Sequence, residues 1–158
     1  MADIKAFPTM PYTHDSEMLS SNGPILTFTA SGTIKVGQVV CFADAGASMT
    51  VLASIKGAGT VPVGVALDNV TDGEKVAVAM MGCVAEVANA DDTATIDTGD
   101  WLECNDNAVA GTVNTATFTA ASDADARNGQ IIGMALEDIG ASGTGYMLIC
   151  PVPQGTTS

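Results

Sequence analysis

A repeated eight-residue motif is the feature that most constrains the fold of this chain. Residues 63–70 read VGVALDNV and residues 132–139 read IGMALEDI, so every position is identical or chemically similar. Each copy is followed by a short turn that contains glycine, and then by a second apolar run at 76–80 or 146–150. Each copy is therefore predicted to form a β-hairpin with an acidic turn.

The repeat extends upstream of both hairpins. GQVVC at 37–41 precedes the first hairpin and GDWLE at 99–103 precedes the second. Two copies are too few for a solenoid but suffice for a pseudo-symmetric sandwich or barrel. We therefore predict one β-domain over 25–158 that contains two similar units, at about 33–87 and 95–152. The glycine inside each motif is expected to permit a bulge or a close backbone approach.

Short apolar runs separated by Gly, Asp and Asn cover the rest of the chain, a pattern typical of short β-strands. The predicted strands are Ile25–Ala30, Val39–Ala43, Thr50–Ser54, Val61–Leu67, Lys75–Met81, Val84–Val87, Trp101–Cys104, Thr115–Thr119, Gln130–Leu136 and Gly145–Cys150. One helical turn is predicted at Ser122–Asn128, capped by Ser122 and ended by Gly129. The predicted class is all-β: a compact sandwich or barrel of short strands.

Residues 1–24 differ from this pattern. Prolines interrupt them, and their apolar residues follow no period. A free tail needs no such residues, so we predict an extended N-terminal arm that lies on a partner; a poorly ordered tail is the alternative. The candidate contact residues of the arm are Phe7, Pro8, Met10, Tyr12, His14 and Leu19.

Composition narrows the function. Hydrophobic residues make up 47% of the 158 residues and charged residues 15%, so the chain can bury a core. The formal charge of −13 argues against binding nucleic acid or an anionic membrane surface, because both need Lys and Arg. The sequence has no apolar run long enough to span a bilayer and no pattern of a signal peptide.

No catalytic set is predicted. His14 is the only histidine, and the chain has neither a GxSxG elbow nor a GxxxxGK[ST] loop. Acidic residues gather at Asp91, Asp92, Asp97 and Asp100, with Glu103 and Asp106 beyond. They lack the spacing of a calcium loop, so we interpret them as a solvated acidic loop and predict no metal and no cofactor.

The four cysteines, Cys41, Cys83, Cys104 and Cys150, form no CxxC pair, which leaves a zinc or redox motif without support. Each lies in an apolar, strand-like run. We predict reduced and mostly buried thiols. Disulfides are the alternative, since the number of cysteines is even.

The order of these motifs resembles one known family. The segments that carry the likeness are LTFTASGTIKVGQVVCF, VGVALDNVTDGEKVAVAMMGCVAEV, DTGDWLECNDNAVAG and IIGMALEDIGASGTGYMLICPV, which together span roughly 25–152. They are similar to the capsid cement, or head decoration, proteins of bacteriophages. In that family a strand led by glycine precedes an x-G-V-A-L hairpin, a V-x-G-V-x-E-V strand follows, and an I-G-x-A-L-E hairpin ends the chain.

The resemblance implies a structural protein on the outer surface of an icosahedral phage capsid, made in the host cytoplasm. It implies the major capsid protein and further copies of the chain, often three, as partners, and it supplies no catalytic residues. A carbohydrate-binding or adhesion module is the alternative, although seven aromatic residues leave little for a sugar-binding groove. A hydrolase that uses acidic residues is a third, weaker hypothesis.

Overall fold

The computed structural model describes residues 20–21, 23–43, 49–54, 61–104, 109–116 and 131–151. All regular elements within these ranges are β-strands. They are β1 (Ser20–Ser21), β2 (Ile25–Ala30), β3 (Val39–Phe42), β4 (Thr50–Ala53), β5 (Pro62–Ala66), β6 (Lys75–Ala79), β7 (Cys83–Ala88), β8 (Trp101–Cys104), β9 (Val113–Thr115), β10 (Ile131–Ala135) and β11 (Thr144–Ile149). The predicted all-β class is confirmed.

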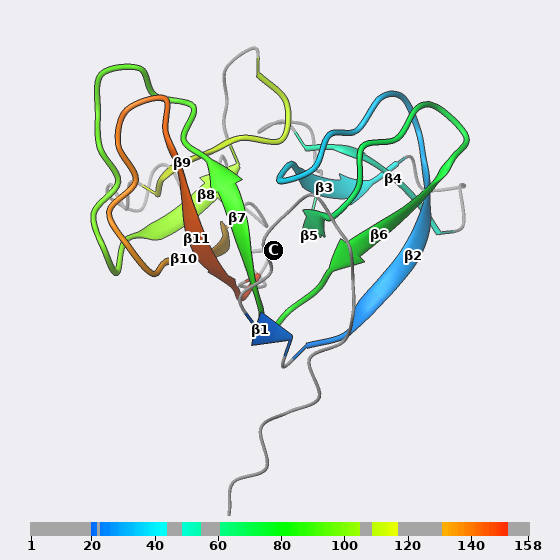
Figure 1. The fold of residues 1–158 in the computed structure, drawn as a ribbon, viewed down its shortest axis with the longest axis horizontal. Helices are drawn as coiled ribbons and strands as arrows, with labels where there is room; N and C mark the ends of the chain where they lie inside the picture. The colour runs from blue at the N-terminus through cyan, green and yellow to red at the C-terminus, as the bar shows by residue number, and fades with distance from the viewer. Residues whose placement is uncertain are drawn as a thin grey trace, which may run out of the picture.

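The strands form two groups that lie side by side (Figure 1). The first, unit 1, is a closed barrel in the order β2-β4-β3-β5-β6. Most of its pairings are antiparallel. β2 and β4 close the barrel in parallel, with Thr29 opposite Thr50 and Ala30 opposite Val51.

The second group, unit 2, comprises β7–β11. Together with β1 these strands form a six-stranded sheet in the order β1-β7-β11-β10-β8-β9. This sheet curls back on itself, because Asn89, directly after β7, forms a parallel bridge with Val113 in β9. The amide of Ala90 also donates a hydrogen bond of 3.0 Å to the carbonyl of Val113.

The two units have the same strand order. β2, β4, β3, β5 and β6 of unit 1 correspond to β7, β9, β8, β10 and β11 of unit 2. The closing contact is shared as well, since the Ala30–Val51 pair corresponds to the Asn89–Val113 bridge. The internal repeat predicted from the sequence is therefore a repeat of the whole five-strand arrangement.

The hairpin motifs make equivalent turn contacts. The amide of Ala77 donates to the Asp68 carboxylate at 3.0 Å, and at the equivalent place the amide of Tyr146 donates to the Glu137 carboxylate at 3.0 Å. The acidic residue of each motif therefore fixes its own hairpin by accepting a backbone hydrogen bond, as in other turns that use a carboxylate.

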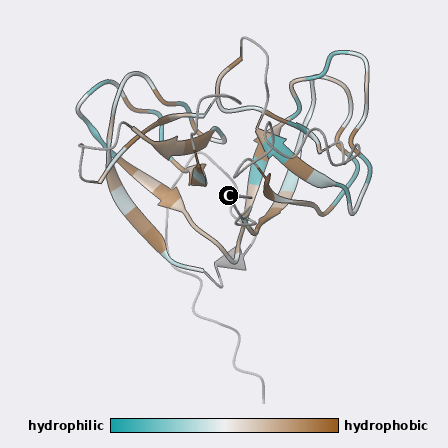
Figure 2. Cartoon of the chain, turned by 180° about the vertical axis from the view of Figure 1, so that it is seen from behind, coloured by the Kyte–Doolittle hydropathy of each residue, from teal (hydrophilic) through white to brown (hydrophobic). Residues whose placement is uncertain are grey.

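Ten buried side chains fill the interior of unit 1: Phe28, Ala30, Ile34, Val40, Val51, Val63, Ala66, Val70, Val76 and Val78. A second cluster fills unit 2 and continues into the contact between the units. Apolar residues concentrate on the strands, and hydrophilic residues gather in loops at the outer ends of the units (Figure 2).

The predicted strands agree closely with the observed ones. Ile25–Ala30 and Trp101–Cys104 match residue for residue, and the others differ by a few residues at their ends. The predicted strand at Thr115–Thr119 lies further along the chain than β9, which spans Val113–Thr115. The predicted helical turn at Ser122–Asn128 lies outside the described residues.

Two strands, β1 and β7, lie near the boundaries that the sequence suggested between the arm and the repeat units. Ser20–Ser21, within the stretch assigned to the arm, form β1, which pairs with Cys83 and Val84 of β7. β7 itself, assigned from the sequence to the end of the first repeat, pairs with β11 of unit 2.

Within the part of the chain that the structure describes, no helix is long and apolar enough to cross a membrane.

Candidate interaction surfaces

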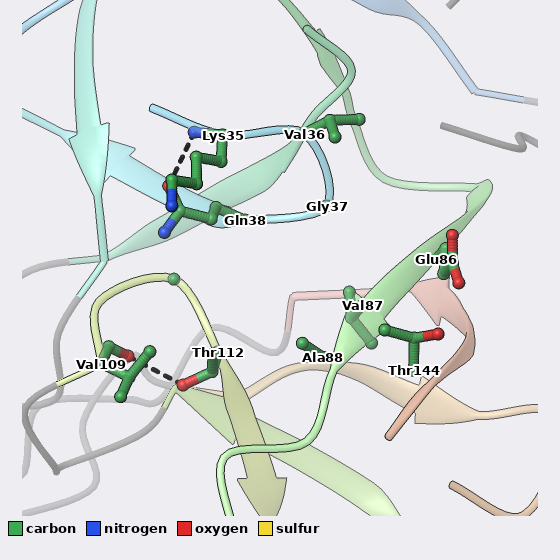
Figure 3. A pocket seen from close by; sticks show the side chains of 11 residues that line it. Lys35, Val36, Gly37, Gln38, Glu86, Val87, Ala88, Val109, Thr112 and Thr144 are labelled. Carbon is green, nitrogen blue, oxygen red and sulfur yellow. Dashed lines mark hydrogen bonds between the residues drawn. The ribbon is translucent and has the colours of Figure 1, made fainter. Parts of the chain in front are cut away.

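A hollow of the described structure lies where the two units meet. It has a volume of about 380 Å³. Its unit 1 side is lined by Lys35, Val36, Gly37 and Gln38 (Figure 3). Its unit 2 side is lined by Glu86, Val87, Ala88, Val109, Gly111, Thr112 and Thr144. We refer to it as the inter-unit cleft.

Backbone contacts hold the cleft together at one end. The amide of Val39 donates to the carbonyl of Gly111 at 2.8 Å, and the amide of Gly111 donates to the carbonyl of Ser54 at 2.7 Å. Gly111 has a φ of 82°, and a Cβ there would overlap the side chain of Gln38. Only glycine fits this position, because the backbone is left-handed and the units approach closely.

The cleft has little chemistry to offer a substrate. Glu86 is the only carboxylate among its lining residues, and Lys35 is their only cation. A glycosidase needs two carboxylates that flank one bond, and the cleft does not supply them. The backbone amide of Lys35 donates to the side-chain oxygen of Gln38 at 2.8 Å, so this Gln38 oxygen stabilises the turn from Lys35 to Gln38.

Two carboxylates of the predicted acidic loop accept hydrogen bonds from the backbone, whereas Glu103 is buried in β8 and so does not belong to a solvated loop. Asp91 accepts hydrogen bonds from the amides of Thr93 and Ala94 at 2.8 and 2.9 Å. These bonds, with the Thr93 amide the largest contributor, lower the pKa of the Asp91 carboxyl. Asp100 accepts from the amide of Asp97 at 3.1 Å. These carboxylates therefore cap turns, while Asp106 lies outside the described residues.

No metal-binding group is found among the residues that the structure describes: nowhere in them do three or more His, Cys, Asp or Glu side chains gather suitably. The thiols of Cys41, Cys83 and Cys104 are buried and that of Cys150 is half-buried. Burial, the largest cause, raises the pKa of the Cys104 thiol to about 11. Such a thiol is a poor nucleophile and a poor metal ligand at neutral pH.

Exposed apolar residues are the more informative surface feature. Among the described residues the large hydrophobic side chains that remain exposed are Leu26, Phe42, Met49, Val61, Met81, Trp101, Val109 and Leu136. Most lie on strands or at strand ends. Exposed apolar groups that gather in one place mark interaction sites.

The predicted arm contacts are not among these residues. Phe7, Pro8, Met10, Tyr12, His14 and Leu19 all lie outside the described residues. Their role stays a prediction.

Comparison with known proteins identifies the family. Residues 20–150 match the sequence model of a family described as phage cement protein. This chain belongs to the phage cement protein family. The matched range covers every strand of both units, so the resemblance noted from the sequence motifs is confirmed, and the protein is a structural phage protein.

One solved structure similar to this member of the phage cement family is described as the head fiber gp8.5 N base in bacteriophage phi29. The similarity covers 80% of this chain and 93% of that chain, with a TM-score of 0.54 and 17% sequence identity. At that identity the likeness concerns the fold. No curated protein matches the sequence.

Proposed function

We propose that this protein decorates the outer surface of an icosahedral phage capsid and stabilises it by bridging neighbouring capsid subunits. The observation that carries the proposal is the family match over residues 20–150, which includes both units. The major capsid protein is the proposed partner, with further copies of this chain, three in the proposed assembly. Synthesis in the host cytoplasm and assembly on the completed shell belong to the same proposal.

The architecture supports a bridging role. Two similar units are joined by backbone hydrogen bonds through Gly111 and by a continuous buried cluster, so the described part of the chain presents two linked units to the shell. A rigid body that contacts two capsid subunits adds binding free energy only to the state in which both are correctly placed. It therefore stabilises that assembled state by linkage.

The acidic charge is compatible with this role. The formal charge of −13 keeps copies in solution from associating nonspecifically before they reach the shell. Several copies held together gain avidity, because each further contact is intramolecular once the first has formed.

Capsid binding is the direct test. The purified full chain is mixed with capsids of its own phage that lack it, and cryo-EM is used to locate added density. The expected result is density outside the shell at junctions between capsid subunits, together with a higher temperature of capsid disruption. Absence of added density at saturating protein concentration contradicts the proposal.

The arm is tested in the same assay. Phe7→Ser, Met10→Ser and Tyr12→Ser combined in the full chain should reduce capsid occupancy, because these apolar residues are the proposed anchor. The circular dichroism spectrum should not change. The matched control is the substitution of three polar residues of the same stretch, Thr9→Ser, Thr13→Ser and Ser16→Ala. Equal occupancy of both variants and the unaltered chain rules out the arm as the anchor.

A further inference from the structure

The contact between the two units has two distinct sides. The cluster that fills it contains eight buried residues that are not part of either unit's interior. Unit 1 contributes Val39, Val65, Leu67 and Ala79, and unit 2 contributes Cys83, Ala85, Cys104 and Ile149. All eight are at most 1% exposed. The contact is therefore head-to-tail: one face of unit 1 meets a different face of unit 2.

Unit 2 repeats the face that unit 1 uses. The strand correspondence places Trp101, Met134, Leu136 and Leu148 where unit 1 has Val39, Val65, Leu67 and Ala79. We call these four residues the leading face. Trp101 is 38% exposed and Leu136 is 41% exposed, and the other two are partly exposed. The leading face is as apolar as its buried counterpart, but nothing in the described chain covers it.

Unit 1 likewise repeats the face that unit 2 uses. Pro24, Leu26, Phe42 and Met80 correspond to Cys83, Ala85, Cys104 and Ile149. We call these four residues the trailing face. Leu26 is 41% exposed and Phe42 is 51% exposed. The buried inter-unit contact therefore has a partly exposed, apolar copy of each of its halves, one on unit 2 and one on unit 1.

We propose that a second copy of this chain covers these faces, with the leading face of one copy packed on the trailing face of the next. The occupant follows from the molecule itself. The counterpart of the leading face is buried by a surface equivalent to the trailing face, within the same chain. Another copy supplies the trailing face, which is the equivalent surface on unit 1, whereas an unrelated partner would need a surface of similar shape.

The backbone at the trailing face supports this assignment. Gly111, which makes the backbone contact between the units, has a φ of 82°. Its counterpart in unit 1 is Met49, which keeps a φ of 55° although it is not glycine and is 48% exposed. A left-handed conformation is uncommon for such a residue. The left-handed conformation of the residue that contacts the neighbouring unit is therefore repeated at the equivalent position of unit 1.

The contact between copies cannot superimpose on the contact within a chain. The intrachain contact joins small residues such as Ala79 and Ala85, whereas the exposed faces carry Trp101 and Phe42 at other equivalent places. Larger side chains hold the two surfaces further apart. A head-to-tail contact then either closes into a ring or continues as a filament, according to the rotation between copies.

A pair of matched variants tests the proposal. Leu136→Asp disrupts the leading face and Leu26→Asp the trailing face, and both leucines are 41% exposed. Each variant alone is expected to be a monomer by light scattering at concentrations where the unaltered chain is an oligomer. An equimolar mixture should form dimers and nothing larger, because each variant retains the face that the other lacks. Val61→Asp, at a residue 54% exposed and outside both faces, is the control that should assemble normally.

The single tryptophan gives a second readout. Trp101 lies in the leading face, so its emission should shift to longer wavelength as the unaltered chain is diluted and dissociates. Leu136→Ser and Leu26→Ser, with circular dichroism to verify folding, replace the aspartate variants if those fail to fold.

The proposal is overturned by an unaltered chain that is monomeric at every concentration, by folded variants that assemble like the unaltered chain, or by a mixture of variants that forms no dimer. A Trp101 emission that is independent of concentration also overturns it, because it means that the chain's own residues cover the face. The inference refines the self-association in the proposed function. It needs no capsid, so its failure leaves capsid binding standing, and a failure of capsid binding leaves it untouched.

Discussion

Gly64 in β5 and Gly133 in β10 occupy the same position in the two units, and each lies against a backbone carbonyl of the neighbouring strand. A Cβ on Gly64 would overlap the carbonyl oxygen of Ala79, and one on Gly133 would overlap that of Leu148. The strand register also shifts at both places, next to Gly64 against β3 and next to Gly133 against β8. The repeated motif predicted a bulge or a close backbone approach at this glycine; the close approach is confirmed, and it is accompanied by the shift in register.

Gly64→Ala and Gly133→Ala should therefore each destabilise the protein by about 1–3 kcal/mol, because the added methyl group meets backbone that cannot move aside. Urea unfolding measures the change. Gly140→Ala is the matched control: a Cβ there meets nothing within 4 Å. That control should leave the free energy of unfolding almost unchanged, and an equal loss in all three variants contradicts the explanation.

A second prediction contrasts two equivalent leucines. Leu67 is fully buried between the units, and Leu136, its counterpart, is 41% exposed. Leu67→Ala should lower the free energy of unfolding by about 2–5 kcal/mol through the cavity it leaves. In dilute protein Leu136→Ala should change it by no more than about 0.5 kcal/mol. Similar losses in both variants at low concentration would mean that Leu136 is also buried within one chain.

A third prediction concerns the turn acceptors. Asp138 accepts hydrogen bonds from the Thr98 hydroxyl and amide at 2.7 and 2.8 Å. Its counterpart in unit 1 is Asn69, which accepts from the amide of Val36 at 3.1 Å. Asp138→Asn should therefore keep the melting temperature close to that of the unaltered chain, while Asp138→Ala should lower it. A larger loss for asparagine than for alanine contradicts this role.

The same carboxylates predict the response to acid. Hydrogen bonds from Thr98, Thr93 and Thr71 lower the pKa of the carboxyl groups of Asp138, Asp91 and Glu74. Unfolding restores their ordinary pKa of about 4, so the unfolded chain binds more protons. Their contribution is present above that value and is lost as the pH falls through the lower folded pKa values.

Urea midpoints measured from pH 6 down to pH 2 should therefore decline below about pH 4. The decline should be smaller in Asp138→Asn, which has lost one of the titrating groups. A midpoint that rises on acidification, or a steeper decline in the asparagine variant, contradicts the assignment.

The thiols give a fifth prediction. The Ser54 hydroxyl donates to the Cys104 sulfur at 3.2 Å in the buried contact between the units, and burial raises the pKa of the Cys104 thiol to about 11. Cys150, half-buried at the end of β11, is more accessible. Iodoacetamide at pH 8 should therefore modify Cys150 first in the folded protein, as mapped by mass spectrometry of peptides. Labelling in urea is the control and should reach all four cysteines. Early modification of Cys104, or a disulfide from Cys41 to Cys104, contradicts the prediction.

Much of the local structure is determined by the sequence alone. Short apolar runs separated by Gly, Asp and Asn indicated which segments form strands, and the repeated motif predicted two equivalent hairpins, because both signals depend on neighbours a few residues apart. The acidic residues could be assigned to turns for the same reason. The candidate arm contacts, including Phe7 and Tyr12, remain predictions, since they lie outside the described residues.

The tertiary structure decided which apolar faces are buried. Val39 and Trp101 each begin a predicted strand after an equivalent glycine-led turn, yet the first is fully buried and the second is 38% exposed. Only the docking of unit 1 on unit 2 distinguishes them, and that contact joins residues far apart in the chain. The closing of the unit 2 sheet at Asn89 could not be predicted from the sequence either. Asn89 occupies the place of Ala30, and its polar side chain is accommodated in a buried position because it donates to the carbonyls of Ala94 and Gly140. Periodicity shows on which face of its sheet a residue lies, whereas its burial depends on which other strands or units pack against that face.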